Sequence, residues 1–479
     1  MSVALAWFRD DLRLDDNPAL LEALRSGMGV IPLFAWQAEE LGVESPSGAA
    51  RWWLHHALAD LDAALRERGS RMFFMRGRAQ DCILRAIEAS GARDVFWNRR
   101  HGPGAAELDA PLERLLRDAG IGVHISSAGL LREPWEVLHD GQSYRVFTAY
   151  FKAASKLPAR RPAGLAPAQL HLPEGRPPDD GPLDALGLMP RFGWTKGIGQ
   201  AWEPTAAGLE VLMQGLPRML EDYGRWRDYP ARAYTSRLSP YLRFGQVSPA
   251  QVLERVRELP DGPGKDCFIR QLSWREFARH VLFHTPALLQ QPLDPKFAHF
   301  PWREDDAALK AWQQGLTGFP IVDAGMRQLW NTGWMHNRAR MIAGSFLVKD
   351  LLLHWRKGAE WFMGTLVDAD AASNFLGWQW LGGCGPDAAP FFRIFNPVLQ
   401  SMKFDPDGYY IRRFVPELAD LPTQWIHAPW TAPERVLANA GISLGRDYPR
   451  PIVDHAFARD RALTARWQMR SKVSDGSDA

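Results

Sequence analysis

Short apolar runs alternate with amphipathic segments along the first 130 residues of the chain. One amphipathic segment starts at Asn17-Pro18, a helix-capping residue followed by proline at the first helical position. Strands that alternate with helices in this way predict a doubly wound α/β domain with a parallel sheet. No GxGxxG motif follows the first run, so the ordinary dinucleotide fingerprint is absent. The expected strands are 3–8, 30–35, 71–75, 94–97 and 122–126, and the other expected helices are 50–68, 81–89 and 105–119.

The pattern changes after this α/β region. Residues 157–192 are rich in proline, alanine and glycine, which is typical of a linker that runs over a surface. From about residue 200 onward the spacing of apolar residues is helical. We expect an α/β domain at 1–130, an interdomain linker at 131–200, an all-α domain at 201–470 and a disordered tail at 471–479. The expected helices of the all-α domain are 206–222, 249–257, 265–283, 305–314, 325–331, 338–355 and 360–372.

Composition narrows the class of protein. Of the 479 residues, 46% are hydrophobic and 23% are charged, as in ordinary globular proteins. The 3 cysteines are far apart and form no CxxC, which excludes a disulfide scaffold and a structural zinc site and suits a reducing compartment. No apolar run is long enough for a signal sequence or a membrane span, so we expect a cytoplasmic protein without a membrane partner. The net charge of +2 means that nucleic-acid binding would need a local basic surface.

Tryptophan is unusually abundant in the expected all-α domain. The chain has 21 tryptophans, of which 15 follow position 190. Each buried indole N–H needs a hydrogen-bond acceptor, so tryptophan is a demanding residue for a helical core. Core packing and a functional role both remain open from composition alone.

Two polar and aromatic segments of the all-α domain suggest contacts with phosphates and bases. In Tyr234–Gly245 three hydroxyls surround an arginine, which suits either phosphate oxygens or an ordinary helix cap. In Phe268–His280 a helix places Gln271, Trp274 and Arg275 on one face. That face favours base stacking, or the packing of a core tryptophan beside solvated arginines.

Two further segments suggest a cavity for a flat ligand. In Gly333–Met341 we expect a helix to align Trp334, Asn337, Arg338 and Met341, which suits a flat ligand or core packing. Val367–Gly383 carries the strongest signal, because it combines two acids, an amide and an indole beside apolar residues. Helical spacing of four aligns Asp370, Asn374 and Trp378, with Asp368 nearby. Buried polar groups of this kind need partners, and a heteroaromatic ligand would provide them. His336 and His354 lack partners at metal-ligand spacing, so we expect structural roles for them and no metal.

Nine motifs in register resemble the photolyase/cryptochrome family across nearly the whole chain. They are AWFRDDLRLDDNPAL (6–20), TSRLSPYL, WREF, GFPIVDAGMRQL (318–329), GWMHNRARM, SFLVKDLL (345–352), DADAASN, GWQW and FFRIFNP. The chain is most similar to bacterial cyclobutane pyrimidine dimer DNA photolyases. The resemblance implies an α/β antenna domain followed by an all-α domain that holds FAD, and a light-driven lyase that repairs UV-damaged DNA as a monomer.

The resemblance also implies which residues bind the cofactor. Asn374 would face flavin N5, and asparagine at this position is typical of photolyases, whereas plant cryptochromes have aspartate. Asp368 and Asp370 would bind the ribose and flavin side. The phosphates would lie on Thr235, Ser236, Arg237, Leu238 and Ser239 with Tyr223 nearby, and the rest of the FAD pocket would include Arg275, Trp334, Asn337 and Arg340.

Electron transfer and DNA contacts follow from the same resemblance. Trp378, Trp355 and Trp302 match the three tryptophans that pass electrons from the surface to the flavin, from innermost to outermost. A dimer flipped out of the DNA stack would lie between Trp274 and Trp380. Asn337 and Met341 would flank the dimer, while Arg338 and Arg393 would contact DNA phosphates.

One position departs from the pattern of cyclobutane-dimer photolyases. Gln271 stands where these enzymes usually carry glutamate, and an amide cannot donate a proton to the dimer. Glutamine is common there in (6-4) photolyases, but these have two adjacent histidines where this chain has His336-Asn337. Cyclobutane repair is the first hypothesis, followed by a cryptochrome-like photoreceptor with weak or no repair, and then by (6-4) repair. The antenna pigment stays open between methenyltetrahydrofolate, a deazaflavin and none.

Overall fold

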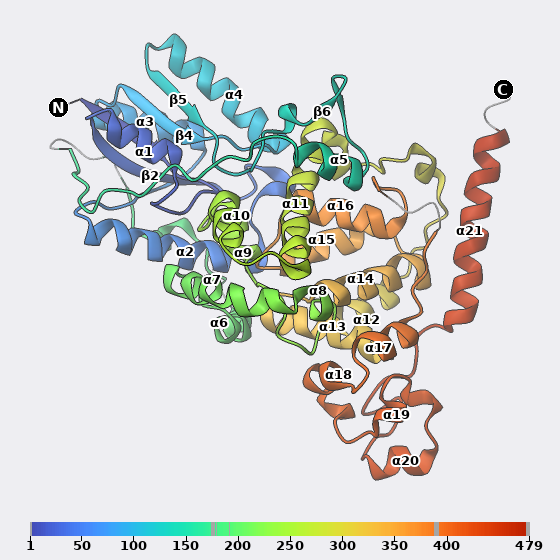
Figure 1. The fold of residues 1–479 in the computed structure, drawn as a ribbon. Coiled ribbons are helices and arrows are strands. Elements are labelled where there is room, and N and C mark those ends of the chain that lie inside the picture. The colour runs from blue at the N-terminus through green and yellow to red at the C-terminus, as the bar shows by residue number, and fades with distance from the viewer. Residues whose placement is uncertain (1, 174–177, 179, 191, 388–391, 476–479) are drawn as a thin grey trace. The chain divides into compact units, whose positions relative to one another are not determined.

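The computed structural model describes residues 2–173, 178, 180–190, 192–387 and 392–475 (Figure 1). The chain forms two compact units. Unit 1 comprises Met1–Glu221, Ser236–Pro286 and Val367–Ala372, and unit 2 comprises Asp222–Thr235, Ala287–Leu366 and Ser373–Ala479.

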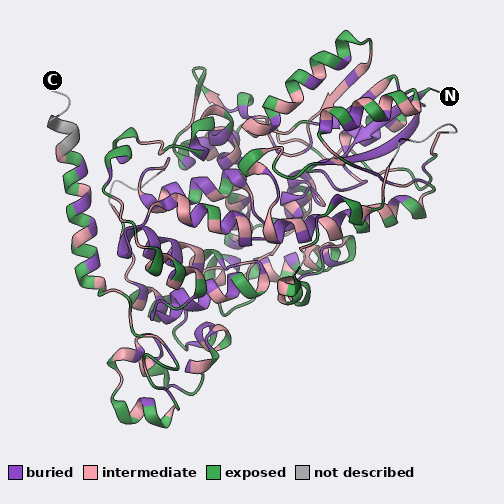
Figure 2. Ribbon diagram, turned by 180° about the vertical axis from the view of Figure 1, so that it is seen from behind, coloured by how far each residue is buried: buried purple, intermediate pink, exposed green. Residues whose placement is uncertain are grey.

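Unit 1 is organised around a parallel sheet, which confirms the predicted α/β region. Its strand order is β3-β2-β1-β4-β5, so the chain moves outward from β1 and then returns to the other side of β1. Strands β1 to β4 are largely buried (purple in Figure 2), as expected for a parallel sheet covered by helices, whereas β5 at the edge of the sheet is mostly partly exposed. The five strands are β1 Val3–Trp7, β2 Gly29–Trp36, β3 Phe73–Arg76, β4 Asp94–Asn98 and β5 Gly122–Ser126.

The helices that alternate with these strands begin close to the predicted positions. Asn17 caps the first helix, because its side chain accepts a hydrogen bond from the Leu20 N–H at 3.2 Å. A core of apolar side chains, including Trp7, Trp97 and Ile83, lies between the sheet and its helices. The helices are α1 Pro18–Arg25, α2 Gly48–Glu67, α3 Ala79–Ser90 and α4 Pro103–Asp118.

The remainder of unit 1 contains a small hairpin, irregular segments and further helices. Residues 157–173 of the expected linker form no helix or strand, but Leu170 is buried and its N–H donates to Arg68 O at 2.6 Å. Linker residues 174–177, 179 and 191 lie outside the described residues. The elements are β6 Leu138–His139, β7 Gln142–Ser143, α5 Phe147–Ala154, α6 Lys196–Ala201, α7 Ala206–Glu221, α9 Ser239–Arg243, α10 Pro249–Arg257 and α11 Pro263–His284.

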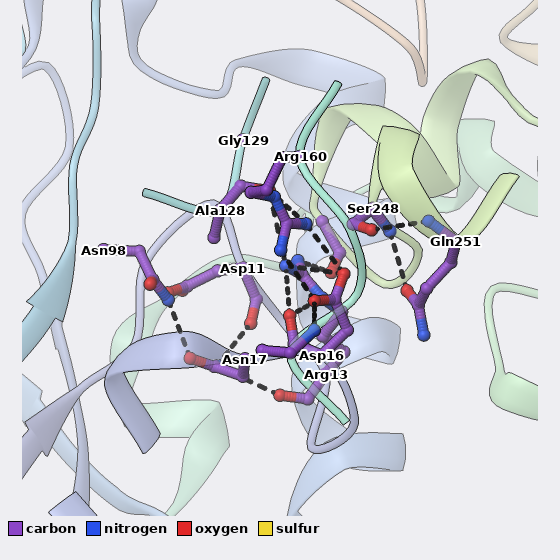
Figure 3. A network of polar contacts seen from close by, with 12 residues as sticks. Asp11, Arg13, Asp16, Asn17, Asn98, Ala128, Gly129, Arg160, Ser248 and Gln251 are labelled. Carbon is purple, nitrogen blue, oxygen red and sulfur yellow. Dashed lines mark hydrogen bonds and ion pairs between the residues drawn. The ribbon is translucent and has the colours of Figure 1, made fainter. Parts of the chain in front are cut away.

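A buried polar network ties the loop after β1 to the linker (Figure 3). Two bonds of 2.7 and 2.8 Å join the Arg160 guanidinium to the carboxylate of Asp16, which is 1% exposed. Arg13 donates to the backbone oxygens of Asp16 and Gly245. Burial alone would raise the pKa of Asp16, but the hydrogen bond from Arg160 and the charge of Arg13 lower it below its ordinary value. In the FRDDLRLDDNP motif, Arg13 and Asp16 therefore have a structural role.

Unit 2 is helical, as predicted for this part of the chain. Its C-terminal helix α21 (red in Figure 1) continues to Asp475, into the stretch from 471 that we expected to be disordered; residues 476–479 lie outside the described residues. The helices are α8 Tyr223–Trp226, α12 Asp306–Gln314, α13 Pro320–Thr332, α14 Asn337–Ser345, α15 Trp355–Thr365, α16 Ala371–Gly382 (its first two residues in unit 1), α17 Pro397–Phe404, α18 Tyr409–Phe414, α19 Thr423–Ile426, α20 Glu434–Asn439 and α21 His455–Asp475.

Two predicted helices of this region are wrong in their extent. The segment 338–355 is not one helix, because α14 ends at Ser345, a π-helical turn follows at Phe346–Asp350, and Leu352 has a φ of +59°. The new helix α15 starts at Trp355, where the His354 side chain caps it. The segment 360–372 is also interrupted, since α15 ends at Thr365 and α16 begins at Ala371. Apolar periodicity continues across both breaks and therefore hides them.

Within the described part of the chain, no helix has the length and apolar character needed to cross a membrane.

Replacing Asp16 by alanine tests the buried network. The Asp16→Ala variant leaves Arg13 and Arg160 without their carboxylate, and breaking a buried ion pair costs about 3–5 kcal/mol of unfolding free energy. Because the pKa of Asp16 is lowered, the wild-type protein should have its full excess of unfolding free energy over the variant above about pH 4. This excess should disappear as the pH falls further and Asp16 becomes protonated. Urea unfolding at several pH values measures both effects.

The matched control is Glu113→Ala. Glu113 and Arg117 form a pair on the surface of α4 at 3.0 Å, with side chains 33% and 52% exposed. Exposed pairs contribute at most about 1 kcal/mol. Equal losses in the two variants would show that the Asp16 network has no special weight.

Candidate functional site

Helix α11 places the predicted face of Gln271, Trp274 and Arg275 in unit 1. All three side chains are partly exposed. Trp274 stacks on Phe147 of α5, with ring centroids 3.8 Å apart and an interplanar angle of 8°. Phe147 thus supports one face of the indole and fixes its plane. The proposed contact of Trp274 with a base stays a prediction.

Arg275 contacts the protein through most of its guanidinium. It donates to Gly129 O at 3.0 Å and to Leu242 O at 3.2 Å, and it lies 3.2 Å from the Glu276 carboxylate. Burial, followed by the charge of Arg279, lowers the pKa of Arg275 to about 10. Arg275 therefore orders the surrounding backbone, whatever else it contacts.

Two arginines that the sequence analysis missed hold the acidic segment before α16. Arg279, one turn after Arg275 on α11, forms an ion pair of 2.7 Å with Asp370. Arg243 donates to Ala369 O at 2.8 Å and to the Asp10 carboxylate at 2.8 Å. The i, i+4 spacing from Arg275 was the available signal for Arg279. Asp370 directly precedes α16 and is not inside the helix, which corrects the expected alignment with Asn374.

A small charged cavity lies in unit 1 after the ends of β1 and β4. This is the point where the strand order of the sheet reverses, and doubly wound sheets commonly bind ligands there. Its volume is about 90 Å³, far below the roughly 300–1,000 Å³ of pockets for drug-sized ligands. Arg100, which lines this cavity, and Arg9 both contact the carboxylate of Asp109 of α4 at 2.6 Å.

The hydroxyl-rich loop runs from unit 2 into unit 1 between Thr235 and Ser236. Arg237 has a φ of +54°, and its guanidinium lies 3.8 Å from the Trp202 ring and donates to Ala201 O. Leu238 is buried and Ser239 begins α9, while Thr235 and Ser236 are partly exposed. Tyr223, also predicted for this site, is buried at the start of α8. Their contact with phosphate stays a prediction.

The segment GWMHNRARM forms a helix start in unit 2. Helix α14 begins at Asn337, so Trp334 precedes it and does not share its face, contrary to our expectation. Asn337 and Met341 are neighbours on the helix, with Nδ2 and Sδ 3.7 Å apart. His336 caps the helix through Nδ1, and burial lowers its pKa to about 4. The structural role predicted for His336 is confirmed.

The arginines of the same helix have protein partners. Arg338 forms an ion pair of 2.7 Å with Asp228, and its guanidinium lies 4.1 Å from the Phe404 ring. Arg340 donates to Met335 O at 2.7 Å. This ion pair is partly buried, with side chains 17% and 37% exposed, and the contact of Arg338 with a phosphate stays a prediction.

Helices α15 and α16 of unit 2 each carry one of the predicted electron-transfer tryptophans. Trp355 and Trp378 are both buried. Trp378 packs against α15 at Gly358, where an added Cβ would lie 2.1 Å from the indole ring. Glycine at this position therefore allows the two helices to approach each other through the indole.

The third predicted tryptophan, Trp302, is linked to Trp355 through a histidine. Trp302 lies 5.3 Å from the His354 ring, and His354 lies 5.4 Å from the Trp355 ring. Trp302 is partly exposed, and its place at the outer end of the chain stays a prediction.

Asn374 is oriented by the neighbouring helix. Its Nδ2 donates to Ala359 O of α15 at 2.9 Å, one turn before Trp378 on α16. The amide hydrogens must face that carbonyl, so Oδ1 is the group that can accept a hydrogen bond from a ligand. An acceptor suits a ring N–H such as that of reduced flavin N5.

Another cavity, in unit 2, is lined by Trp380 and Arg393, both predicted to contact DNA. Its volume is about 340 Å³. Trp380 donates through Nε1 to Asp387 O at 3.1 Å. Lys349, also in the wall, is 1% exposed, donates to Gly382 O at 2.7 Å and lies 3.2 Å from the Phe392 ring. Burial holds the pKa of Lys349 well below its usual value.

Comparison with known proteins gives consistent matches. Residues 4–168 match the DNA photolyase family and residues 268–468 match the FAD binding domain of DNA photolyase. A deoxyribodipyrimidine photo-lyase of Agrobacterium fabrum is 44% identical over 96% of this chain and 97% of its own. Cryptochrome-1 of Arabidopsis thaliana is 39% identical over 99% of this chain and 72% of its own. A crystal structure of a class III photolyase from Agrobacterium tumefaciens has a TM-score of 0.93 and 43% identity, covering 98% of both chains.

The protein is thus a flavoprotein with an FAD-binding helical domain. It belongs to the photolyase and cryptochrome family.

The described residues suit FAD as a ligand. Nη1 of Arg279 is buried without a hydrogen-bond partner among them, beside the Asp370 carboxylate. A donor of this kind needs an acceptor from a ligand or water. Taken separately, Oδ1 of Asn374 in unit 2 and the hydroxyls of Thr235 and Ser236 are also polar groups of the kind that a dinucleotide requires.

Replacing Gly358 by alanine tests the close contact of α15 with Trp378. Overpacking of this kind typically costs about 1–3 kcal/mol, so the unfolding free energy should fall and the indole should shift. Gly364→Ala on the same helix is the control, because nothing lies within 4 Å of a Cβ there. Thermal unfolding with tryptophan fluorescence measures both, and a stable Gly358→Ala variant with unchanged fluorescence would contradict the expected clash.

Proposed function

We propose that the protein is a deoxyribodipyrimidine photo-lyase that splits cyclobutane pyrimidine dimers in DNA with light. The observation that carries this proposal is the arrangement around α16: Asn374 presents an acceptor one turn from Trp378, and Trp378 packs on the helix that begins with Trp355. When bound, reduced FAD supplies an electron under light, and the electron returns after the cyclobutane ring has opened.

Different side chains serve the cofactor and the lesion in this proposal. Thr235, Ser236 and Ser239 bind the phosphates, and Asp368 and Asp370 bind the ribose and flavin side. Trp378, Trp355 and Trp302 pass electrons inward to restore the reduced cofactor. The remaining cofactor contacts are Tyr223, Arg237, Leu238, Arg275, Trp334, Asn337 and Arg340.

The proposed DNA contacts are mainly aromatic and cationic. Trp274, which Phe147 supports from one side, and Trp380 stack on the flipped dimer. Asn337 and Met341, adjacent on α14, flank the dimer. Arg338 and Arg393 contact phosphates, which fix the position of the strand without reading its sequence.

Asn337 supports the cyclobutane dimer as the substrate, because (6-4) enzymes carry a histidine at the corresponding position. Gln271 supports the alternatives. As an amide it can donate a hydrogen bond to the dimer but no proton. A cryptochrome-like photoreceptor is the second candidate, because a curated cryptochrome is 39% identical to this chain. Repair of (6-4) photoproducts is the third candidate.

The proposal also covers the setting in which the protein acts. Cys82, Cys267 and Cys384 are free thiols, which supports a reducing compartment such as the cytoplasm. We propose that the protein acts there as a monomer on UV-damaged DNA.

Repair of a defined oligonucleotide tests the proposed function. After flavin reduction, blue light should restore an oligonucleotide with one thymine dimer, as measured by chromatography. Trp380→Ala should weaken binding of damaged DNA by about 1–3 kcal/mol, the usual cost of losing one base-stacking contact. Normal flavin photoreduction without any repair would favour the photoreceptor, and repair of a (6-4) oligonucleotide alone would favour the third candidate.

Replacing Gln271 by glutamate tests the role of the missing acid. Gln271→Glu should raise the repair quantum yield severalfold if a proton donor limits ring opening, because a positioned acid or base typically contributes 10²–10⁴-fold. The comparison is made with saturating dimer under single-turnover illumination. An equal or lower yield would show that the amide is not the limiting group.

A further inference from the structure

The imidazole of His354 lies between two tryptophans of the proposed electron chain. Its ring centroid is 5.3 Å from that of Trp302 and 5.4 Å from that of Trp355. Trp302 belongs to the segment before α12, and Trp355 is the first residue of α15. A charge on this ring would therefore act on both indoles at close range and at nearly equal distance.

Local contacts keep His354 in its neutral form. Nδ1 accepts a hydrogen bond from the Arg356 N–H at 3.1 Å, so the ring proton lies on Nε2. A second proton would have to bind Nδ1 and would break this helix cap. Burial, followed by the positive charge of Arg356, lowers the pKa of His354 below 6.5. Glu304 opposes this shift and Lys357 adds to it.

We infer that His354 is a positioning residue for electron transfer, whose neutral ring allows the positive hole formed on Trp378 to move outward to Trp355 and Trp302. This inference rests on the proposed electron chain. It assigns a task to a histidine that no other part of the proposed mechanism uses.

The electron steps show where a charge would act. An electron passes from Trp355 to oxidised Trp378, and a second electron passes from Trp302 to Trp355. No bond or proton moves, and an external thiol finally reduces Trp302. An imidazolium would make Trp355 and Trp302 harder to oxidise by similar amounts, because its distances to them are almost equal. It would therefore oppose the first step and leave the second nearly unaffected.

The size of this effect is measurable. The equilibrium in question is electron transfer from Trp355 to oxidised Trp378. At about 5 Å and an effective dielectric constant of about 20–40, one positive charge on His354 shifts it by roughly tenfold or more toward oxidised Trp378. The hole would then stay near the cofactor and recombine. The yield of oxidised Trp302 should fall accordingly.

Two substitutions separate charge from structure. His354→Lys and His354→Met both remove the ring and the cap, but only lysine adds a positive charge. In the flavin-loaded protein, the yield of the long-lived tryptophan radical after a blue laser pulse should be about tenfold lower for His354→Lys than for His354→Met. Equal yields in the two variants would overturn the inference. Trp355→Phe tests the underlying chain, since a normal radical yield in that variant would refute the electron chain itself.

The wild-type protein gives an independent test through pH. The radical yield should be constant above about pH 6.5 and should fall as the pH drops through the lower pKa of His354. His354→Asn keeps a capping side chain without a titrating ring, so its yield should not show this fall.

Carbon-13 NMR of labelled histidine measures the pKa without flavin photochemistry. The His354→Asn spectrum identifies the signal, which should titrate below pH 6.5. This measurement, and the pH profile, decide the matter even if His354→Lys does not fold. A pKa of 7 or higher would overturn the inference, because the ring would then be charged during normal function.

Discussion

A single buried amide, Gln379, fixes the helix on which the site of unit 2 depends. Its Nε2 donates to Leu288 O at 2.9 Å and to Gln291 O at 2.7 Å, and its Oε1 accepts from the Leu293 N–H at 2.9 Å. Its backbone oxygen also accepts from the N–H groups of residues 383, 384 and 385. A fully satisfied buried amide specifies one geometry, because any shift of α16 would leave polar groups unpaired. Trp378 and Trp380 stand on either side of it in sequence, so both indoles inherit this fixed position.

Unit 1 uses buried charge for the same purpose. Asp16, Asp109 and Asp370 are each paired with at least one arginine at 2.6–2.8 Å. Uncompensated buried charges are costly, so each pair restricts the backbone segments that carry its members. The Arg279–Asp370 pair is the most relevant, because it fixes the turn before α16 from within unit 1.

The sequence predicted the elements better than their ends. The strands and the Asn17 cap follow from local pattern and side-chain chemistry, which act over a few residues. The breaks at Ser345–Trp355 and Thr365–Ala371 were missed because apolar spacing continues across both. At the first break, a positive φ at Leu352 and a cap by His354 start a new helix. Arg243 was missed because its partners, Asp10 and Ala369, are far away in sequence. Motif resemblance found residues that local physics could not, whereas helical spacing wrongly placed Trp334 on the face of a helix that begins only at Asn337.

The many tryptophans of this chain can serve both core packing and electron transfer, and one role does not exclude the other. Trp312 donates to Ala343 O and contacts the Trp378 ring at 6.0 Å, so it acts as a core residue that holds another indole. Trp378 in turn packs on Gly358 and Phe362. Tight packing limits the motion of the indole rings and excludes water from around them. Less rearrangement of the surroundings is then needed for each electron-transfer step. The best-packed indoles of this core are therefore also the best suited to pass electrons, and a packing role for Trp378 is no argument against an electron-transfer role.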